Sequence, residues 1–359
     1  MKRLSLFLAL TLCISLLAGC AGTPVVYQTN CTCPVEAHAP AAPAEAPEAP
    51  AAEGALKTGL YISAGIGDSK SAEGENNGEG KYDVTMVAVL VDDAGIIRDC
   101  VIDGISASVP FDSQGSITAD LTAAPQTKNE LGENYGMVAY GGAIAEWDQQ
   151  AAALASYAVG KTVEELKNGA IDETGKAPAG SDLATSATIY LGGYVAAIEE
   201  AVKNAVHLGA QAGDELKLAS VNGIDSSAAA TAEKDGTAQL DATVTALTVN
   251  GGTITSCTID AVQAKVNFSA DGTITSDLTA PVQTKNQLGE NYGMVAWGGA
   301  IAEWDEQAAA FASYITGKTL EQVKGIAVDE STHPVDADLA TSVTIAIGGF
   351  QALVEKAVQ

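Results

Sequence analysis

The sequence predicts an α+β protein with two tandem homologous domains, each a small antiparallel sheet packed by helices, after a disordered lipoprotein linker. The clearest observation is an internal repeat, because residues 126–162 recur as residues 283–319 with only six differences. In both copies, β-prone runs come before the repeated block and helical apolar spacing follows them. An apolar N-terminus and an Ala/Pro/Glu-rich segment precede the first copy.

Residues 1–19 have the features of an export signal. Lys2 and Arg3 precede an apolar run, residues 4–17, that is short for a membrane-spanning helix. The run ends in Leu-Ala-Gly-Cys, which resembles the bacterial lipobox and implies cleavage before a diacylglycerol-modified Cys20. An ordinary signal peptide followed by a chance cysteine is the alternative. We therefore expect an extracytoplasmic protein attached to a bacterial cell membrane through the lipid on Cys20.

Residues 20–56 are predicted to form a spacer. Their Ala, Pro and Glu content is too polar and too proline-rich to bury a core, so this segment is expected to stay extended. Cys31 and Cys33 lie within it, and either a strained local disulfide or a pairing between chains fits their spacing.

Composition limits the range of functions. The chain has 359 residues and a formal net charge of −27, which argues against nucleic acid as a partner. The repeat boundaries give domains over residues 57–207 and 212–359, each long enough for its own core. Cys100 and Cys257 occupy equivalent positions in strand-like segments, where small buried apolar residues are expected.

Strands open each copy. Asn-Gly-Gly at 250–252 separates two β-prone runs and is a hairpin signal, and Asp-Asp-Ala-Gly separates the corresponding runs of the first copy. The predicted strands cover residues 81–91, 96–105, 239–249 and 253–262.

Helices follow the strands. Apolar residues at three- and four-residue spacing, including Ile144 and Trp147, predict a helix over residues 142–157. Thr162 and Thr319 each begin a capping-box pattern that predicts a short helix. Amphipathic helices are expected at the end of each copy, over residues 194–206 and 350–358.

Few residues suit catalysis or metal binding. The chain has three histidines, and none recurs in both copies, which excludes a duplicated Ser-His-Asp or zinc site. Lys128 and its counterpart Lys285 either bind phosphate or pair with Glu133 and Glu290. Trp147 is expected in the core, with a ligand contact as the alternative. No catalytic residue and no metal ligand is assigned.

The order of elements resembles the FMN-binding domain family, in which Asp-x-x-Ser/Thr-Gly-Ala-Thr precedes a final amphipathic helix. In the first copy the matching positions are Asp182, Thr185, Ala187 and Thr188, with Ser186 in place of the glycine. The resemblance implies FMN joined to Thr188 through its phosphate by a flavin transferase. Residues 188–191 are also β-prone, so a buried strand is an alternative for this segment.

The second copy carries the same pattern less completely, at Asp338, Thr341 and Thr344, with Ser342 and Val343 in place of the glycine and alanine. The resemblance implies Thr344 as a second site of FMN attachment. It also implies a flavin-based electron carrier in extracellular electron transfer, reduced by a membrane electron donor.

Two other functions are alternatives to the electron carrier. One is a non-enzymatic surface lipoprotein that binds a small ligand, glycan or protein partner, with Tyr135, Tyr140 and Trp147 lining a groove. The other is an enzyme that uses Glu146 and Asp148, but residues two apart on a helix point in different directions and make a poor acid/base pair. We therefore expect a carrier or binding module and no turnover enzyme.

Overall fold

The computed structural model describes residues 54–359, which belong to one compact unit of mixed α and β structure. The signal, Cys20, Cys31 and Cys33 lie outside these residues. The strands are β1 (Lys57–Gly65), β2 (Gly78–Val91), β3 (Ile97–Phe111), β4 (Glu215–Gly223), β5 (Gly236–Asn250) and β6 (Thr253–Phe268). They form two antiparallel sheets of three strands, in the orders β1-β2-β3 and β4-β5-β6, which agrees with the predicted α+β class.

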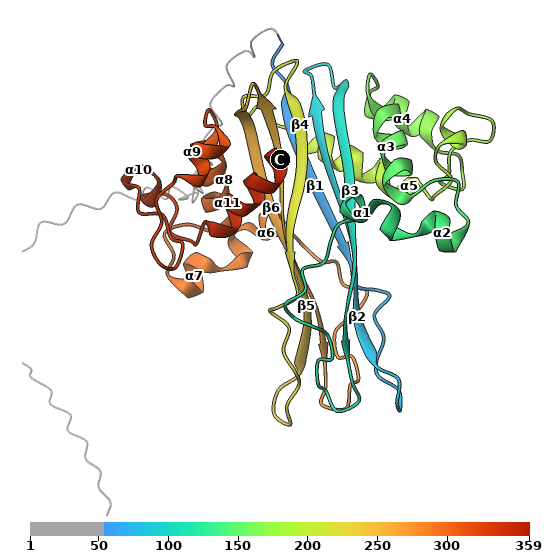
Figure 1. Cartoon of the computed structure of the whole chain (residues 1–359), viewed down its shortest axis with the longest axis vertical. Coiled ribbons are helices and arrows are strands. Elements are labelled where there is room, and N and C mark those ends of the chain that lie inside the picture. Colours follow the sequence, from blue (N-terminus) through green and yellow to red (C-terminus); the bar gives the residue numbers. More distant parts are fainter. Residues whose placement is uncertain (1–53) are drawn as a thin grey trace, which may run out of the picture. The chain divides into compact units, whose positions relative to one another are not determined.

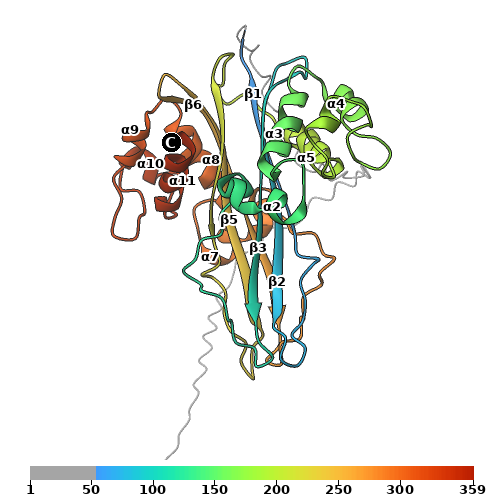
Figure 2. The same cartoon turned by 45° about the vertical axis from the view of Figure 1, so that its right-hand side comes forward.

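The helices of the two copies lie on opposite outer sides of the pair of sheets (Figure 1), and in the view turned by 45° α9 and α4 still stand at opposite sides (Figure 2). In the first copy they are α1 (Lys128–Leu131), α2 (Met137–Gly141), α3 (Trp147–Ala158), α4 (Val163–Ala170) and α5 (Gly192–Lys203). In the second copy they are α6 (Lys285–Leu288), α7 (Met294–Gly298), α8 (Trp304–Ile315), α9 (Leu320–Lys324), α10 (Ala337–Ala340) and α11 (Gly348–Val358). No helix within residues 54–359 is both long enough and apolar enough to cross a membrane.

Both faces of the central strands are buried. In β2, Met86, Ala88 and Leu90 point into a core that both sheets share, whereas Val87 and Val89 point toward the helices. The strand therefore reads as a continuous apolar run. The same burial explains β5, where the apolar residues of the sequence favour neither face because Ala246 lies in the shared core and Leu247 contacts the helices.

The two sheets pack through pairs of equivalent contacts, one made by each copy to the other. The rings of Phe111 and Phe268, equivalent residues that are both fully buried, stack with centroids 3.9 Å apart. The Ala72 backbone N–H donates to the carbonyl of Gly272 at 2.9 Å, and the equivalent Ala230 N–H donates to Gly115 at 2.8 Å. A core that spans both copies therefore accompanies the separate helix-side core of each copy.

Several expected elements differ in extent. The helix predicted from residue 142 begins at Trp147, because Gly142 takes a φ of +64° and Glu146 is an extended N-cap. Ile144 consequently lies outside the helix and is 57% exposed, which corrects the expected buried face. The hairpin turn at residues 250–252 and the capping boxes of Thr162 and Thr319 are present as predicted.

Candidate functional site

The threonines of the flavin-like motif lie in exposed loops. Thr188 follows a short 3-10 turn, Leu183–Thr185, and precedes α5, which corrects the alternative of a buried strand over residues 188–191. Its backbone N–H donates to Oε1 of the buried Gln150 at 2.7 Å, and its hydroxyl lies 3.3 Å from the same oxygen. Ser186 has a φ of −118°, an ordinary value for serine, so this backbone does not require the motif glycine.

The second copy repeats this loop. The Thr344 backbone N–H donates to Oε1 of Gln307 at 2.8 Å, and the hydroxyl lies 3.2 Å from that oxygen. The remaining motif side chains, those of Asp182, Thr185, Asp338 and Thr341, are exposed. The hydroxyl of Thr185 donates to the backbone carbonyl of Asp182, and the hydroxyl of Thr341 donates to that of Asp338. The buried glutamines thus fix the loops without burying the threonine hydroxyls.

Lys128 has a structural position. Its ammonium nitrogen lies 5.0 Å from the ring centroid of Trp147 and 5.5 Å from that of Tyr135. Its carboxylate partner is Asp83, at 4.0 Å, which corrects the expected pairing with Glu133. Burial lowers the pKa of Lys128. The Asp83 carboxylate and the two aromatic faces act in the opposite direction, because they favour the protonated ammonium form.

The aromatic residues proposed to line one groove are separated. Trp147 is 3% exposed and its indole N–H donates to the Tyr194 hydroxyl at 3.0 Å, which confirms its core position. Tyr140 is 92% exposed, and so is its counterpart Trp297. The structure therefore corrects the groove, because a buried indole and a ring in solvent cannot line the same surface.

Glu146 serves as a helix anchor. Its two carboxylate oxygens accept the backbone N–H groups of Met137 and Val138, at 2.8 and 3.0 Å. The side chain is 5% exposed, and Glu303 makes the same two bonds at the same distances in the second copy. The glutamate therefore fixes the first turn of α2 and has no free oxygen for acid/base chemistry.

Two clefts at equivalent places were not anticipated from the sequence. The first, which we call the α3 cleft, has a volume of about 330 Å³ and lies between α3 and β3. The second, the α8 cleft, has a volume of about 540 Å³ and lies between α8 and β6. The α3 cleft is lined by Cys100, Val101, Ile102, Asn129, Asp148, Ala152, Ala155 and Ser156. The α8 cleft is lined by Cys257, Thr258, Ile259, Asn286, Asp305, Ala309, Ala312, Ser313 and Thr316, and by Val206, His207 and Leu208.

Each cleft is lined by an aspartate, and one carboxylate oxygen of that aspartate is buried and lacks a donor. Oδ1 of Asp148 is buried and accepts no hydrogen bond from residues 54–359, and the same is true of Oδ1 of Asp305. Both aspartates are the second residue of their helix, where a negative charge interacts favourably with the helix dipole. That interaction does not supply the missing donor, and a buried acceptor without a partner costs about 1–3 kcal/mol.

The other side chains that line the clefts include an asparagine, a serine and a cysteine in each copy, among small or apolar residues. Asn129 Nδ2 donates to the Ile102 carbonyl at 3.0 Å, and Asn286 makes the equivalent bond at 3.1 Å. The cysteine on the inner wall is buried in both clefts, and burial raises the pKa of the Cys257 thiol to about 12. The thiols are therefore protonated at neutral pH and act as small apolar groups, as the sequence predicts.

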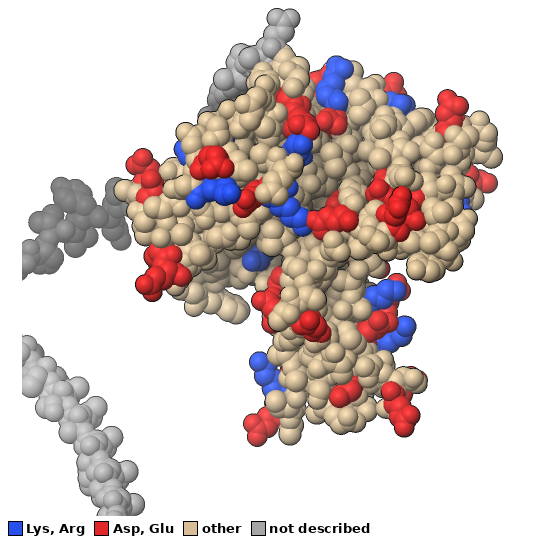
Figure 3. Space-filling view, viewed as in Figure 1, with Lys and Arg blue, Asp and Glu red and all other residues tan. Residues whose placement is uncertain are grey.

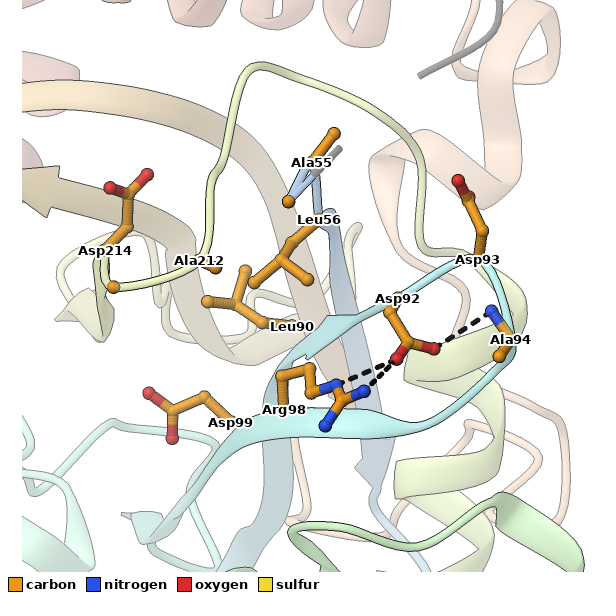
Figure 4. Close-up of a pocket in the computed structure, with 12 residues that line it drawn as sticks. Ala55, Leu56, Leu90, Asp92, Asp93, Ala94, Arg98, Asp99, Ala212 and Asp214 are labelled. Carbon is orange, nitrogen blue, oxygen red and sulfur yellow. Dashed lines mark hydrogen bonds and ion pairs between the residues drawn. The ribbon is translucent and has the colours of Figure 1, made fainter. Parts of the chain in front are cut away.

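A further cavity, of about 770 Å³, lies beside the β2–β3 hairpin and is rich in acidic residues (Figure 4). There Asp92 pairs with Arg98 at 2.8 Å, whereas Asp93 pairs with a lysine and a histidine. Asp99 accepts the backbone N–H of the next residue, and Asp214 accepts three hydrogen bonds. These carboxylates all have partners within the protein. None of them has a buried oxygen without a donor, in contrast to Asp148 and Asp305.

Comparison with protein-family models, with curated proteins and with solved structures gives no match. Within residues 54–359, no group of three or more His, Cys, Asp or Glu side chains is arranged to hold a metal ion. The α3 and α8 clefts are therefore the candidate site, on their geometry alone.

Proposed function

We propose that the protein is a lipid-anchored, extracytoplasmic binding protein that holds a small ligand in each of its two clefts. The observation that carries the proposal is the recurrence of one cleft, lined by equivalent cysteine, asparagine and aspartate residues, at the same place in both copies. The clefts have volumes typical of small-molecule sites. The export signal and Cys20 support a location on the outer side of a membrane, where ligand would be captured from the surroundings.

Native mass spectrometry of the protein, purified at low ionic strength from a cell that exports it, tests this function. The wild-type chain is expected to carry additional small-molecule mass. The variant Ala152→Phe/Ala309→Phe should lose that mass, because both alanines lie on the exposed walls of the clefts, where a phenyl ring fills the space without entering the core. Ala232→Phe, at an exposed position away from both clefts, is the matched control. Equal occupancy in all three proteins would exclude the clefts.

A flavin carrier is the second candidate, and the exposed loops of Thr188 and Thr344 favour it. An exposed threonine hydroxyl is accessible to a transferase, whereas one inside a sheet is not. The proposal predicts FMN on these hydroxyls when the chain is exported by a host with an extracytoplasmic flavin transferase.

The test is flavin fluorescence of the denatured protein on a gel. A fluorescent band that disappears in Thr188→Ala/Thr344→Ala supports covalent FMN, and a dark wild-type band excludes it. Thr122→Ala, at an exposed threonine outside the motif, is the control.

A further inference from the structure

A second space adjoins the α8 cleft and indicates the chemical class of its ligand, an inference that rests on the proposed binding function. This space, which we call the seam space, has a volume of about 250 Å³ and lies between β1 and β6, which are edge strands of the two sheets. Val206, Thr258 and Asn286 line both the seam space and the α8 cleft. One ligand can therefore extend from the cleft into the seam.

In the first copy, a lysine closes the equivalent seam between β3 and β4. The ammonium group of Lys356 donates to the Ser220 carbonyl at 2.7 Å and pairs with Glu130. Ser220 and Glu130 are the counterparts of Ile62 and Gln287, which line the seam space. The lysine side chain therefore spans the region that corresponds to the seam space.

Within residues 54–359, the second copy does not have this bridge. The counterpart of Lys356 is Glu200, which pairs with Lys203 of its own helix at 2.8 Å. Gln287 replaces the carboxylate that holds the lysine, so this position keeps its hydrogen-bonding capacity and carries no charge. The seam space is consequently open, and it has a neutral amide where the first copy binds an ammonium group.

Asp260 also lines the seam space, but it has a structural role in both copies. Its Oδ1 accepts the backbone N–H groups of Ala261 and Asn286, at 2.7 and 3.0 Å. Asp103, its counterpart, accepts the equivalent two N–H groups in the first copy. This aspartate therefore does not distinguish the open seam from the closed one.

Three exposed amide side chains line the seam space, those of Asn204, Asn286 and Gln287. Nδ2 of Asn204 donates to the Leu60 carbonyl at 3.0 Å, and Nδ2 of Asn286 donates to the Ile259 carbonyl at 3.1 Å. Within residues 54–359, Oδ1 of each asparagine and Nε2 of Gln287 make no hydrogen bond. Free acceptors beside a free donor are complementary to hydroxyl groups, because a hydroxyl both donates and accepts.

An aromatic residue lines the same space. Tyr61 is half-buried there, whereas its counterpart in the first copy is Ala219. A tyrosine ring presents a broad apolar face. The C–H groups of a sugar ring pack on such a face while its hydroxyl groups reach the amides around it.

The charge of the chain disfavours an anionic ligand. The formal net charge is −27, and acidic side chains are spread over the face shown in Figure 3 with the fewer Lys and Arg side chains among them. A field of this sign lowers the local concentration of anions. Together with the neutral Gln287, it favours an uncharged ligand in the seam.

We propose that the α8 cleft and the seam space together hold one small neutral saccharide, with Asn204, Asn286 and Gln287 hydrogen-bonded to its hydroxyl groups. The α3 cleft does not take this ligand, because Lys356 closes its seam.

Isothermal titration calorimetry of the whole exported chain tests the proposal with glucose, N-acetylglucosamine, maltose and cellobiose. Glucosamine in its ammonium form and glucuronate are the charged analogues. The expected result is that at least one neutral sugar binds, at one site per chain and more tightly than either charged analogue.

Transfer of the first copy's lysine bridge to the second copy tests the location. Glu200→Lys/Gln287→Glu recreates the pair made by Lys356 and Glu130 and should abolish sugar binding. Glu330→Lys/Gln322→Glu makes the same two charge changes at exposed positions outside the seam and should bind like wild type. Gln287→Ala removes one amide and should weaken binding roughly twofold to tenfold, the loss of one neutral hydrogen bond. Thermal melting establishes that each variant is folded.

Other outcomes separate the ligand class from the function. If a charged analogue binds more tightly than every neutral sugar, or if Glu200→Lys/Gln287→Glu binds sugar like wild type, the saccharide assignment is overturned. If no sugar binds while the purified protein carries a ligand mass that Ala152→Phe/Ala309→Phe removes, the saccharide assignment is overturned and the binding function stands. If no sugar binds and no such mass is found, both are overturned.

Discussion

The substitution Phe111→Ala tests whether the two copies fold as one unit. Phe111 is fully buried in the core shared by the sheets, and its ring stacks on Phe268 at 3.9 Å with the planes 1° from parallel. Truncating a buried phenylalanine costs about 3–5 kcal/mol, and an aromatic pair contributes about 0.5–1.5 kcal/mol beyond its area. We therefore expect the free energy of unfolding to fall by about 4 kcal/mol, a large share of typical domain stability.

The assay is urea unfolding followed by tryptophan fluorescence in each copy separately. Trp147 and Trp304 are buried in the helix-side cores of the first and second copies. Replacing Trp297 by Tyr, the residue at its counterpart, and one of the buried indoles by Phe leaves a single reporter. Because the shared core couples the copies, both reporters should show the same lowered midpoint.

A transition that moves for Trp147 and stays in place for Trp304 would refute this reasoning, since it would mean that the second copy is stable without its partner. Leu154→Ala is the comparison. Leu154 is fully buried on the helix side of the first copy only, so its loss is of similar size but does not touch the shared core.

Three further predictions follow from individual contacts. Glu146→Ala leaves two backbone N–H groups of α2 without their acceptor and should lower the free energy of unfolding by about 2 kcal/mol in a urea titration, whereas Glu133→Ala, at an exposed site, should change it by less than about 0.5 kcal/mol. Tyr140→Ser/Trp297→Ser should leave the thermal midpoint within about 1 °C of wild type, because both rings are 92% exposed; a fall of several degrees would show that the rings are packed. The pKa of Asp260 is raised from 3.8 to about 6, so between these pH values the folded state binds more protons there and this group's contribution to stability falls as pH rises. The stability difference between wild type and Asp260→Asn should therefore change across that range, and a constant difference would contradict the shift.

The predicted fold class is confirmed at the level of an α+β protein with antiparallel sheets, and particular elements show why. Turn residues at 250–252 and capping boxes at Thr162 and Thr319 are local signals, which need no knowledge of the rest of the fold. Strands β1 and β4 were not predicted, because Lys57–Gly65 and Glu215–Gly223 mix glycine, lysine and polar residues with their apolar ones. Their pairing with β2 and β5 is a long-range interaction that the local pattern does not contain.

The candidate site was less predictable than the fold. Asp148 appeared only as a carboxylate two residues from Glu146, and nothing in that spacing distinguishes the anchored glutamate from the unsatisfied aspartate. The distinction depends on where each side chain points once α3 packs on β3. The two clefts also require Cys100 and Asn129, which are far from Asp148 in the sequence. The sequence signal that comes closest to identifying the clefts is the set of small and polar residues that both copies share.

The contacts between the copies have the character of a two-fold axis. Phe111 meets its own counterpart, and the hydrogen bond from Ala72 to Gly272 is returned by the bond from Ala230 to Gly115. An isologous interface of this kind is the signature of a homodimer, here joined in one chain so that assembly no longer depends on protein concentration. Because the two copies are joined in one chain, their sequences need not be identical. Residues 206–208, in the segment that connects the copies, line the α8 cleft and not the α3 cleft. If both clefts bind ligands as proposed, one chain can therefore have two different binding specificities.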